Sequence, residues 1–478
     1  MSFNSIDFLI FLPVVLIIYW LLPHRGQNIF LLSASYFFLC YIHLWFGVLI
    51  FLVTAVNFLS GIAIVRWPDK KRAILINALV LCLLELGYFK YASFFLENLF
   101  VVLDTFGIPY SQFVLSILLP VGISFYTFQA IAYTIDVYRN DTSPCYDPVN
   151  FALFISFFPQ LVAGPIERSR NLLPQIQLPR SISPEIVQQG LLLLLWGFFK
   201  KLVIADNTGL IAFKVFSLSD PGFHILWSGV FAFSIQILAD FWSYTDMARG
   251  SALLLGFKLS RNFDHPYFAT SPADFWRRWH MTLSYWLRDY VYIPLGGSRV
   301  QSSLRKCSNI MITFLLSGLW HGASWNFILW GGYHGLLVLL DRTSRTIVSK
   351  IRLLIPKSLS YPFLFLQVLV TFFFINIGWL FFRETDIHRL IEFFQLNPAA
   401  STESDIHIAA YFITLTALYS IPIFLHGLLH SMDKYLRGPQ QQYSPNLLML
   451  RPVLAALLLL GVLTLRSPEP STFIYFQF

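Results

Sequence analysis

The stretch Gly318-Leu319-Trp320-His321-Gly322-Ala323-Ser324-Trp325-Asn326 places a histidine among small residues inside an apolar segment, residues 309–340. This segment has about 32 residues, whereas one membrane crossing takes about 20. Both of its flanks are basic, so we expect the chain to enter the membrane and return on the same side. The glycine-rich stretch would then form the turn. An ionisable side chain at such a place indicates a functional site, so we expect His321 at the end of a pocket.

The composition of the whole chain is that of a membrane protein. Hydrophobic residues make up 56% of the chain and charged residues 12%, about half the ~25% typical of soluble domains. We predict an all-α polytopic protein with 11–12 transmembrane or re-entrant segments. The segments 185–216 and 223–256 are long enough to be bent pairs of helices, and the segment 150–163 need not cross the membrane. We expect the first apolar segment, near 6–22, to be a retained membrane span and not a cleaved signal peptide. The apolar segments lie near residues 6–22, 28–42, 44–65, 72–89, 111–134, 150–163, 185–216, 223–256, 309–340, 361–382, 406–427 and 449–465.

The net charge of +8 is better explained by membrane topology than by nucleic-acid binding, because the basic residues lie in short connections between apolar runs. The connection 66–72 and the region after residue 340 are predicted to be cytoplasmic. The acidic loop 384–405 and the N-terminus would then lie outside. We expect residues 1–466 to form one membrane-embedded domain, with the tail 467–478 on the extracytoplasmic face.

Several common functional sites have no counterpart in the sequence. The four cysteines, at positions 40, 82, 145 and 307, do not have the spacing of a zinc site or a disulfide framework. The chain contains no phosphate-binding glycine loop, no HExxH motif and no GxSxG nucleophile elbow. We therefore predict no metal and no bound cofactor.

A second dense group of polar residues runs from Ser271 to Tyr290. Ser271 and Pro272 are typical of a helix start, and Asp274 suits its positive end. We predict one helix of about five turns, in which Trp276, His280, Leu283 and Leu287 share a face. Asp274 can pair with Arg277 or Arg278, which follow it by three and four residues. So many charges indicate a helix that lines a cavity or lies at the membrane interface.

The histidines differ in how strongly their sequence context suggests function. His43 and His334 are interpreted as structural residues of the core or the interface. For His280 and His321 the local sequence leaves a structural and a catalytic role equally open. The many Phe and Trp side chains are most simply interpreted as facing lipid or the interface.

Several motifs, in order along the chain, resemble those of the membrane-bound O-acyltransferase (MBOAT) family. The resemblance extends nearly from end to end and is strongest to the bacterial alginate O-acetyltransferase branch, with teichoic acid D-alanyl transferases more distant. The motifs are PVGISFYTFQ at 120–129, DVYR at 136–139, FFPQLVAGPI at 157–166, DFWRRWH at 274–280, WLRDY at 286–290 and GLWHG at 318–322.

The resemblance implies a ring of helices around a thin core, with funnels from both faces that meet near the catalytic histidine. His321 corresponds by motif to that histidine, and His280 to the second histidine of the family pattern. The segment 240–250, which begins with Asp240, departs from a family motif: Trp242-Ser243 stands where Ser-Gly is expected, and Arg249 where an apolar residue is expected. This departure bears on the acceptor and the subfamily.

The chemistry of acetyl transfer fits these residues. A hydroxyl that attacks a thioester must lose its proton, and a histidine with a pKa near ~6.5 can remove it, typically contributing ~10²–10⁴-fold. We predict His321 as this base and His280 as a group that orients a substrate or stabilises the tetrahedral intermediate. The predicted supporting or substrate-binding residues are Arg278, Asp289, Trp320, Asn326 and Asp240.

The last six residues, Phe473 to Phe478, resemble a terminal aromatic motif of this branch or of its small partner subunits. There, a tyrosine is proposed to carry the acyl group. In this chain the corresponding residue is Tyr475, about nine residues after Arg466. Nine residues span at most roughly 30 Å, so the tail could fold back into an outer funnel. Tyr475 is therefore a third candidate catalytic residue. An aromatic tail that simply anchors in the lipid interface is an equally good interpretation.

We expect an acetyltransferase of the bacterial inner membrane that takes acetyl from cytoplasmic acetyl-coenzyme A for the O-acetylation of an exported polysaccharide. The resemblance also implies an extracytoplasmic partner of the SGNH-hydrolase type. One alternative is D-alanyl transfer from a carrier protein. Another is a polysaccharide transporter without covalent chemistry, for which inverted repeats would be expected; the sequence has none that we recognise.

Overall fold

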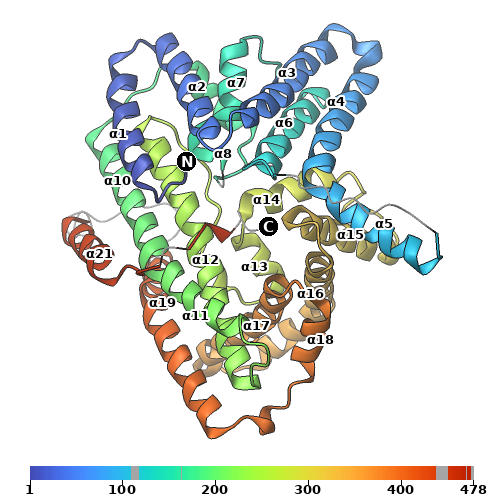
Figure 1. Cartoon of the computed structure of the whole chain (residues 1–478), viewed down its shortest axis with the longest axis vertical. Coiled ribbons are helices and arrows are strands. Elements are labelled where there is room, and N and C mark those ends of the chain that lie inside the picture. Colours follow the sequence, from blue (N-terminus) through green and yellow to red (C-terminus); the bar gives the residue numbers. More distant parts are fainter. Residues whose placement is uncertain (109–117, 163, 438–450, 470, 475–478) are drawn as a thin grey trace. The chain divides into compact units, whose positions relative to one another are not determined.

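The chain is built from helices. A computed structural model describes residues 1–108, 118–162, 164–437, 451–469 and 471–474, and every regular element in these ranges is helical. The described residues form two compact units, one of Met1–Leu194 with Tyr244–Ser260 and one of Leu195–Ser243 with Arg261–Phe478. The predicted all-α class is confirmed. Figure 1 labels the helices along the chain.

Several helices are suited to cross a membrane. Among the described residues, six helical segments are long and apolar enough, and three shorter apolar helices accompany them. The prediction of a multi-pass membrane protein is confirmed, whereas the predicted spans 111–134 and 449–465 lie partly outside the described residues. The six are Trp45–Arg66, Pro68–Thr105, Pro184–Phe216, Phe223–Leu254, Ser360–Arg383 and Glu403–Ser431; the shorter ones are Ile6–Leu21, Pro148–Leu161 and Pro452–Leu465.

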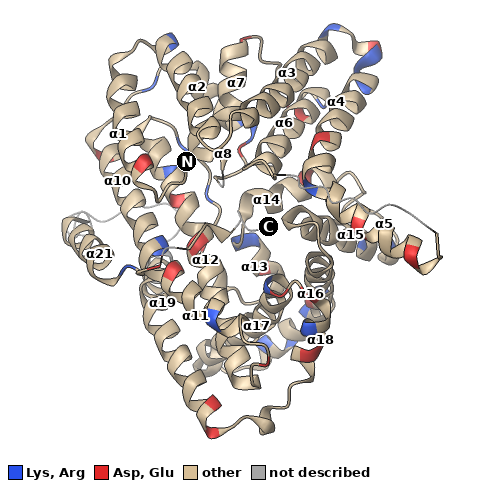
Figure 2. Ribbon diagram, viewed as in Figure 1, with Lys and Arg blue, Asp and Glu red and all other residues tan. Residues whose placement is uncertain are grey.

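The first unit packs around α6, most of whose residues are buried. In its contact with α3, Thr134 donates a hydrogen bond of 2.6 Å to the buried Asn57. Charged residues gather at the turn between α3 and α4, the 66–72 connection (Figure 2). The helices of this unit are α1 (Ile6–Leu21), α2 (His24–Cys40), α3 (Trp45–Arg66), α4 (Lys71–Leu86), α5 (Ala92–Thr105), α6 (Ile123–Tyr138), α7 (Pro148–Ser156), α8 (Phe158–Leu161), α9 (Ser169–Gln177) and the first part of α10 (Pro184–Phe199).

The second unit contains the polar segment 271–290 and the hairpin 309–340. In the predicted segment 185–216, a π-helical stretch, Lys200–Ala205, joins α10 to α11. The predicted segment 223–256 is not a bent pair but one helix, α12, of 32 residues. The helices of this unit are α11 (Asp206–Phe216), the first part of α12 (Phe223–Leu254), α13 (Pro272–Arg278), α14 (Met281–Leu287), α15 (Ser303–His321), α16 (Trp325–Leu354), α17 (Ser360–Arg383), α18 (Ile387–Gln395), α19 (Glu403–Arg437) and α21 (Arg451–Leu465).

The predicted turn within 309–340 is confirmed. Helix α15 ends at His321 and α16 begins at Trp325, and the two helices pack side by side (Figure 1). Glycines make this close approach possible, because a Cβ atom on Gly318 would lie 2.1 Å from the backbone oxygen of Phe327. A Cβ on Gly331 would lie 2.4 Å from the oxygen of Phe314. The backbones of the two helices are therefore in direct contact.

The predicted single helix over 272–290 is wrong. The serine cap and the acidic first turn are present, since Ser271 accepts a hydrogen bond from the Asp274 N–H group. Asp274 also pairs with Arg277 and Arg278, as predicted. The helix then ends at Arg278, and His280 adopts a left-handed conformation before α14 begins. His280 consequently does not share a helix face with Trp276.

We predict opposite effects of alanine at two glycines of the hairpin. Gly318→Ala should lower the free energy of unfolding by about 1–3 kcal/mol, because its Cβ forces the helices apart. Gly332→Ala is the matched control: its Cβ would make an ordinary 3.7 Å contact with Leu315, so helix propensity should raise stability by up to about 1 kcal/mol. Thermal melts in detergent, followed by tryptophan fluorescence, measure both. Equal shifts in the two variants would contradict the close packing.

Candidate active site

His321 lies where α15 ends, and its side chain is almost entirely enclosed by aromatic rings. Its exposed fraction is 3%. The imidazole centroid is 4.9 Å from that of Trp320, 4.8 Å from Trp330 and 5.3 Å from Phe382. These rings come from α15, α16 and α17, so the packing of three helices determines the position of the imidazole.

His280 is held in a strained turn. Its φ angle is 41°, which a residue other than glycine rarely adopts. The buried Asn262 stabilises this turn. Its backbone oxygen accepts the Met281 N–H at 2.9 Å, and its side-chain oxygen accepts the Thr282 hydroxyl at 2.6 Å. Strain of this kind is concentrated at functional sites, and it directs His280 into the interior, where its exposed fraction is 1%.

The two predicted histidines meet at one tryptophan. The Trp320 ring centroid is 5.6 Å from that of His280 and 4.9 Å from that of His321. On its other side, His280 contacts Phe241 of α12 at 4.7 Å between centroids. The structure therefore brings together His280, Trp320 and His321, which are separated by up to 41 positions in the sequence.

His334, interpreted from sequence as structural, is close to the same group. Trp330 lies between the two histidines of the hairpin, with centroid distances of 4.8 Å to His321 and 4.9 Å to His334. His334 is fully buried and also packs against Trp276 at 5.1 Å. His43, by contrast, is exposed. His334 is thus packed against aromatic rings and against the backbone at Gly378, and the structural role predicted for it stays a prediction.

Three predicted supporting residues make contacts within their own surroundings. Asn326 donates hydrogen bonds to the backbone oxygens of Phe381 and Phe382, at 3.2 and 3.4 Å, and so joins the start of α16 to the end of α17. Arg278 pairs with Asp274 at 3.0 Å, and Asp289 with its neighbour Arg288 at 2.7 Å. Asn326 thus helps to hold Phe382 against His321. Arg278 and Asp289, by contrast, form ion pairs with Asp274 and Arg288.

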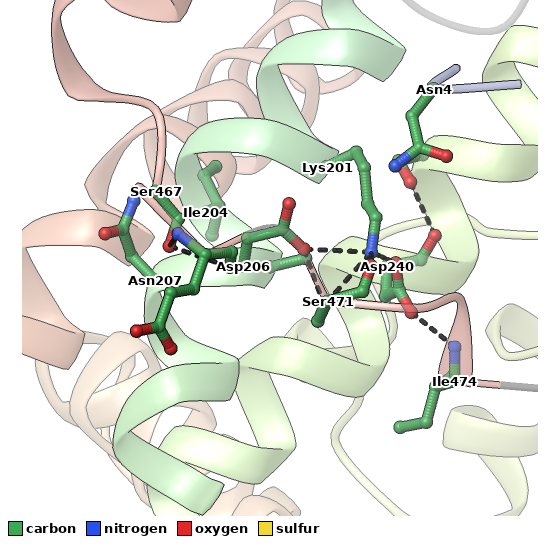
Figure 3. A network of polar contacts seen from close by, with 12 residues as sticks. Asn4, Lys201, Ile204, Asp206, Asn207, Asp240, Ser467, Ser471 and Ile474 are labelled. Carbon is green, nitrogen blue, oxygen red and sulfur yellow. Dashed lines mark hydrogen bonds and ion pairs between the residues drawn. The ribbon is translucent and has the colours of Figure 1, made fainter. Parts of the chain in front are cut away.

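Asp240 connects the site to the C-terminal tail. Its carboxylate pairs with the buried Lys201 and accepts the Ile474 N–H at 2.7 Å (Figure 3). Phe473 packs on Phe241 at 6.2 Å between centroids. The exposed fractions of Phe473 and Ile474 are 1% and 2%. These two residues are therefore buried in protein, which contradicts their anchoring in lipid. Tyr475 lies outside the described residues.

Sequence reasoning missed residues that hold this arrangement. Asn262 lies in a loop with no recognisable motif, so no local signal distinguishes it. Lys201 and Asp206 could have been found from the sequence, because they are charged residues within a predicted span, where such residues usually have a function. Phe241 lies in the segment 240–250, which is similar to a family motif, but its contact with His280 depends on the tertiary fold.

The site is suited to proton transfer in a dry environment. Burial lowers the pKa of His280, which lies between the short helices α13 and α14 and outside the membrane-crossing ones, from 6.5 to about 3. Its imidazole is therefore neutral at pH 7 and can donate or accept one hydrogen bond. Among the described residues, no three His, Cys, Asp or Glu side chains are grouped to hold a metal ion.

The buried His280 should make stability depend on pH. Its pKa is about 3 in the folded chain and near 6.5 when exposed, so below pH 6.5 the unfolded state binds more protons. The stabilisation is complete above pH 6.5, and about 2 kcal/mol of it is lost by pH 5. We expect the fall in melting temperature from pH 7.5 to 5 to be smaller in His280→Gln than in the native chain. Identical falls would contradict this assignment.

Comparison with known proteins agrees with this geometry. The model of the membrane-bound O-acyltransferase family matches residues 142–382, which include His280 and His321. The chain is 37% identical to a probable alginate O-acetylase AlgI of Azotobacter vinelandii, over the whole of both chains. It is 33% identical to a peptidoglycan O-acetyltransferase of Helicobacter pylori, over 98% of this chain and 95% of the relative. It is 31% identical to a teichoic acid D-alanyltransferase of Streptococcus thermophilus, over 52% of this chain and 63% of the relative. The chain belongs to the membrane-bound O-acyltransferase family and is a multi-pass membrane enzyme that transfers acyl groups.

Proposed function

We propose that this enzyme takes acetyl from cytoplasmic acetyl-coenzyme A and passes it across the bacterial inner membrane for O-acetylation of an exported polysaccharide. The observation that carries the proposal is the meeting of His280 and His321 at the Trp320 ring. The relatives support an acetyl group and a glycan acceptor, since two of them are named for alginate and peptidoglycan O-acetylation.

In the proposed reaction, His321 is the general base. A hydroxyl oxygen attacks the carbonyl carbon of the thioester while His321 accepts the hydroxyl proton. The tetrahedral intermediate collapses, the C–S bond breaks, and the proton passes from His321 to the coenzyme A sulfur. The neutral His280 donates a hydrogen bond to the oxyanion of the intermediate. The products are an acetyl ester and free coenzyme A, and no change of oxidation state is involved.

The first hydroxyl in this scheme is the phenol of Tyr475. Its pKa near ~10 in water leaves it protonated at pH 7, so it needs a base. The burial of Phe473 and Ile474, and the contact of Phe473 with Phe241, support a tail that reaches the histidines. A hydroxyl of the acceptor, or of an SGNH-type partner on the extracytoplasmic side, then attacks the tyrosyl acetyl ester and restores the phenol.

A pocket beside the tail supports the acceptor side of this scheme. Its volume is about 190 Å³, and its wall includes Gln236, Arg383 and Glu469 as well as the tail residues Ser471 and Ile474. Phe233, in the same wall, contacts Phe382, which contacts His321. Polar and aromatic groups of this kind suit a hydroxyl-rich acceptor.

Two other functions were considered from the sequence. A transporter without covalent chemistry is no longer an alternative, because the chain belongs to an acyltransferase family. D-alanyl transfer keeps some support from the D-alanyltransferase relative, although that similarity covers only 52% of this chain. Competition between acetyl-coenzyme A and a D-alanyl carrier protein as thioester donors would separate the two reactions.

The test is the transfer of labelled acetyl from acetyl-coenzyme A to the purified protein in lipid vesicles without acceptor. We expect label on Tyr475, located by mass spectrometry, and a loss of about 10²–10⁴-fold in its rate in His321→Ala. Tyr475→Phe should take no label. The control is His43→Ala, which removes an exposed histidine. Coenzyme A release at the native rate by a folded His321→Ala variant would contradict the proposed base.

A further inference from the structure

A fully buried cation lies where α10 and α11 join. The side chain of Lys201 has an exposed fraction of 0%, and its amino group is 2.9 Å from carboxylate oxygens of both Asp206 and Asp240 (Figure 3). These three residues, the Lys201 triad, belong to two helical segments that are apolar enough to cross a membrane. Charged residues in such segments are costly and usually functional.

The C-terminal tail supplies the remaining hydrogen bonds of this triad. The Ser471 hydroxyl donates to Asp206 at 2.6 Å, and the Ile474 N–H donates to Asp240 at 2.7 Å. Lys201 donates to the backbone oxygen and to the hydroxyl oxygen of Ser471, at 2.9 and 3.1 Å. One cation and two carboxylates leave an excess negative charge, and the two donors from the tail are directed at the carboxylates.

A third contact lies closer to the start of the tail. The Ser467 N–H donates to the backbone oxygen of Leu202 at 3.0 Å. The tail is thus tied to residues 201–206 at Ser467 and Ser471, and to Asp240 of α12 at Ile474. Beyond these ties, Phe473 packs on Phe241, the ring that contacts His280. Tyr475 is joined to Ile474 by a single peptide bond.

We propose that Lys201, Asp206 and Asp240 form a binding site for the C-terminal segment and hold Phe473 against Phe241, the ring that contacts His280. The triad residues are positioning residues, because they act on the reaction through the tail. Docking of the tail follows from the contacts alone. Its consequence for acetyl transfer rests on the relay through Tyr475 proposed above.

Variants of the tail test this proposal more cleanly than variants of the triad. Lys201→Met would leave two buried carboxylates without their cation and is expected to fold poorly. Ser471→Ala removes a donor and an acceptor from the tail, whereas Ser471→Thr keeps the hydroxyl. Ile474→Pro removes the N–H that Asp240 accepts, whereas Ile474→Val keeps it. Lys214→Met, an exposed lysine on α11, is the control for loss of a lysine.

The first measurement does not depend on activity. Carboxypeptidase digestion of the full-length protein in detergent, followed by intact mass spectrometry, should release Ile474 slowly from the native chain. Release of Ile474 should be about tenfold faster or more in Ser471→Ala, the factor expected for loss of a hydrogen bond to a charged group. Ser471→Thr, Ile474→Val and Lys214→Met should behave like the native chain. Equal digestion of all variants would overturn the proposed binding site.

The second measurement is acetyl transfer. We expect kcat to fall in Ser471→Ala and Ile474→Pro with little change in KM for acetyl-coenzyme A, because the donor site is intact, and Ser471→Thr to restore kcat. Faster digestion with unchanged kcat would overturn the positioning role. If the native chain takes no label on Tyr475 while digestion behaves as expected, the relay is wrong and the binding of the tail by the triad is supported.

Discussion

The direct contact between the backbones of α15 and α16 is the constraint on which the candidate active site depends. With Gly318 against Phe327 and Gly331 against Phe314, no side chain separates the two helices at these points. This contact places the turn of the hairpin, and therefore His321, against Trp330 of the returning helix and Phe382 of α17. Small residues are needed there because a membrane provides little hydrophobic force between helices, and close packing takes its place.

The second principle in this structure is that polar groups buried in a membrane protein need partners within the protein. Asn326 uses its amide to join α16 to the end of α17, and Asn262 uses both of its oxygens to hold the turn at His280. The Lys201 triad follows the same principle with full charges, and part of what satisfies it is the C-terminal tail. A tail that solvates buried charges has a defined position, whereas a tail at the lipid surface would not.

These contacts converge on a small aromatic region. Trp320 contacts both histidines, and Phe241 contacts both His280 and Phe473 of the tail. Rings of this size exclude water, which keeps the imidazole of His280 neutral and strengthens any hydrogen bond to a developing negative charge. The strained backbone at His280 costs free energy, which the hydrogen bonds of Asn262 offset.

The sequence by itself determined the membrane class, the all-helical fold, the hairpin at 309–340 and the family, because apolar runs, basic flanks and ordered motifs are local features. It also predicted His280 and His321 as site residues, through the motifs that contain them. Only the tertiary structure decided that the helix after Ser271 breaks at His280, since Asn262 satisfies the turn from outside the helix. It alone placed Ile474 on Asp240, 234 residues apart, because a hydrogen bond between distant segments leaves no periodic trace in the sequence.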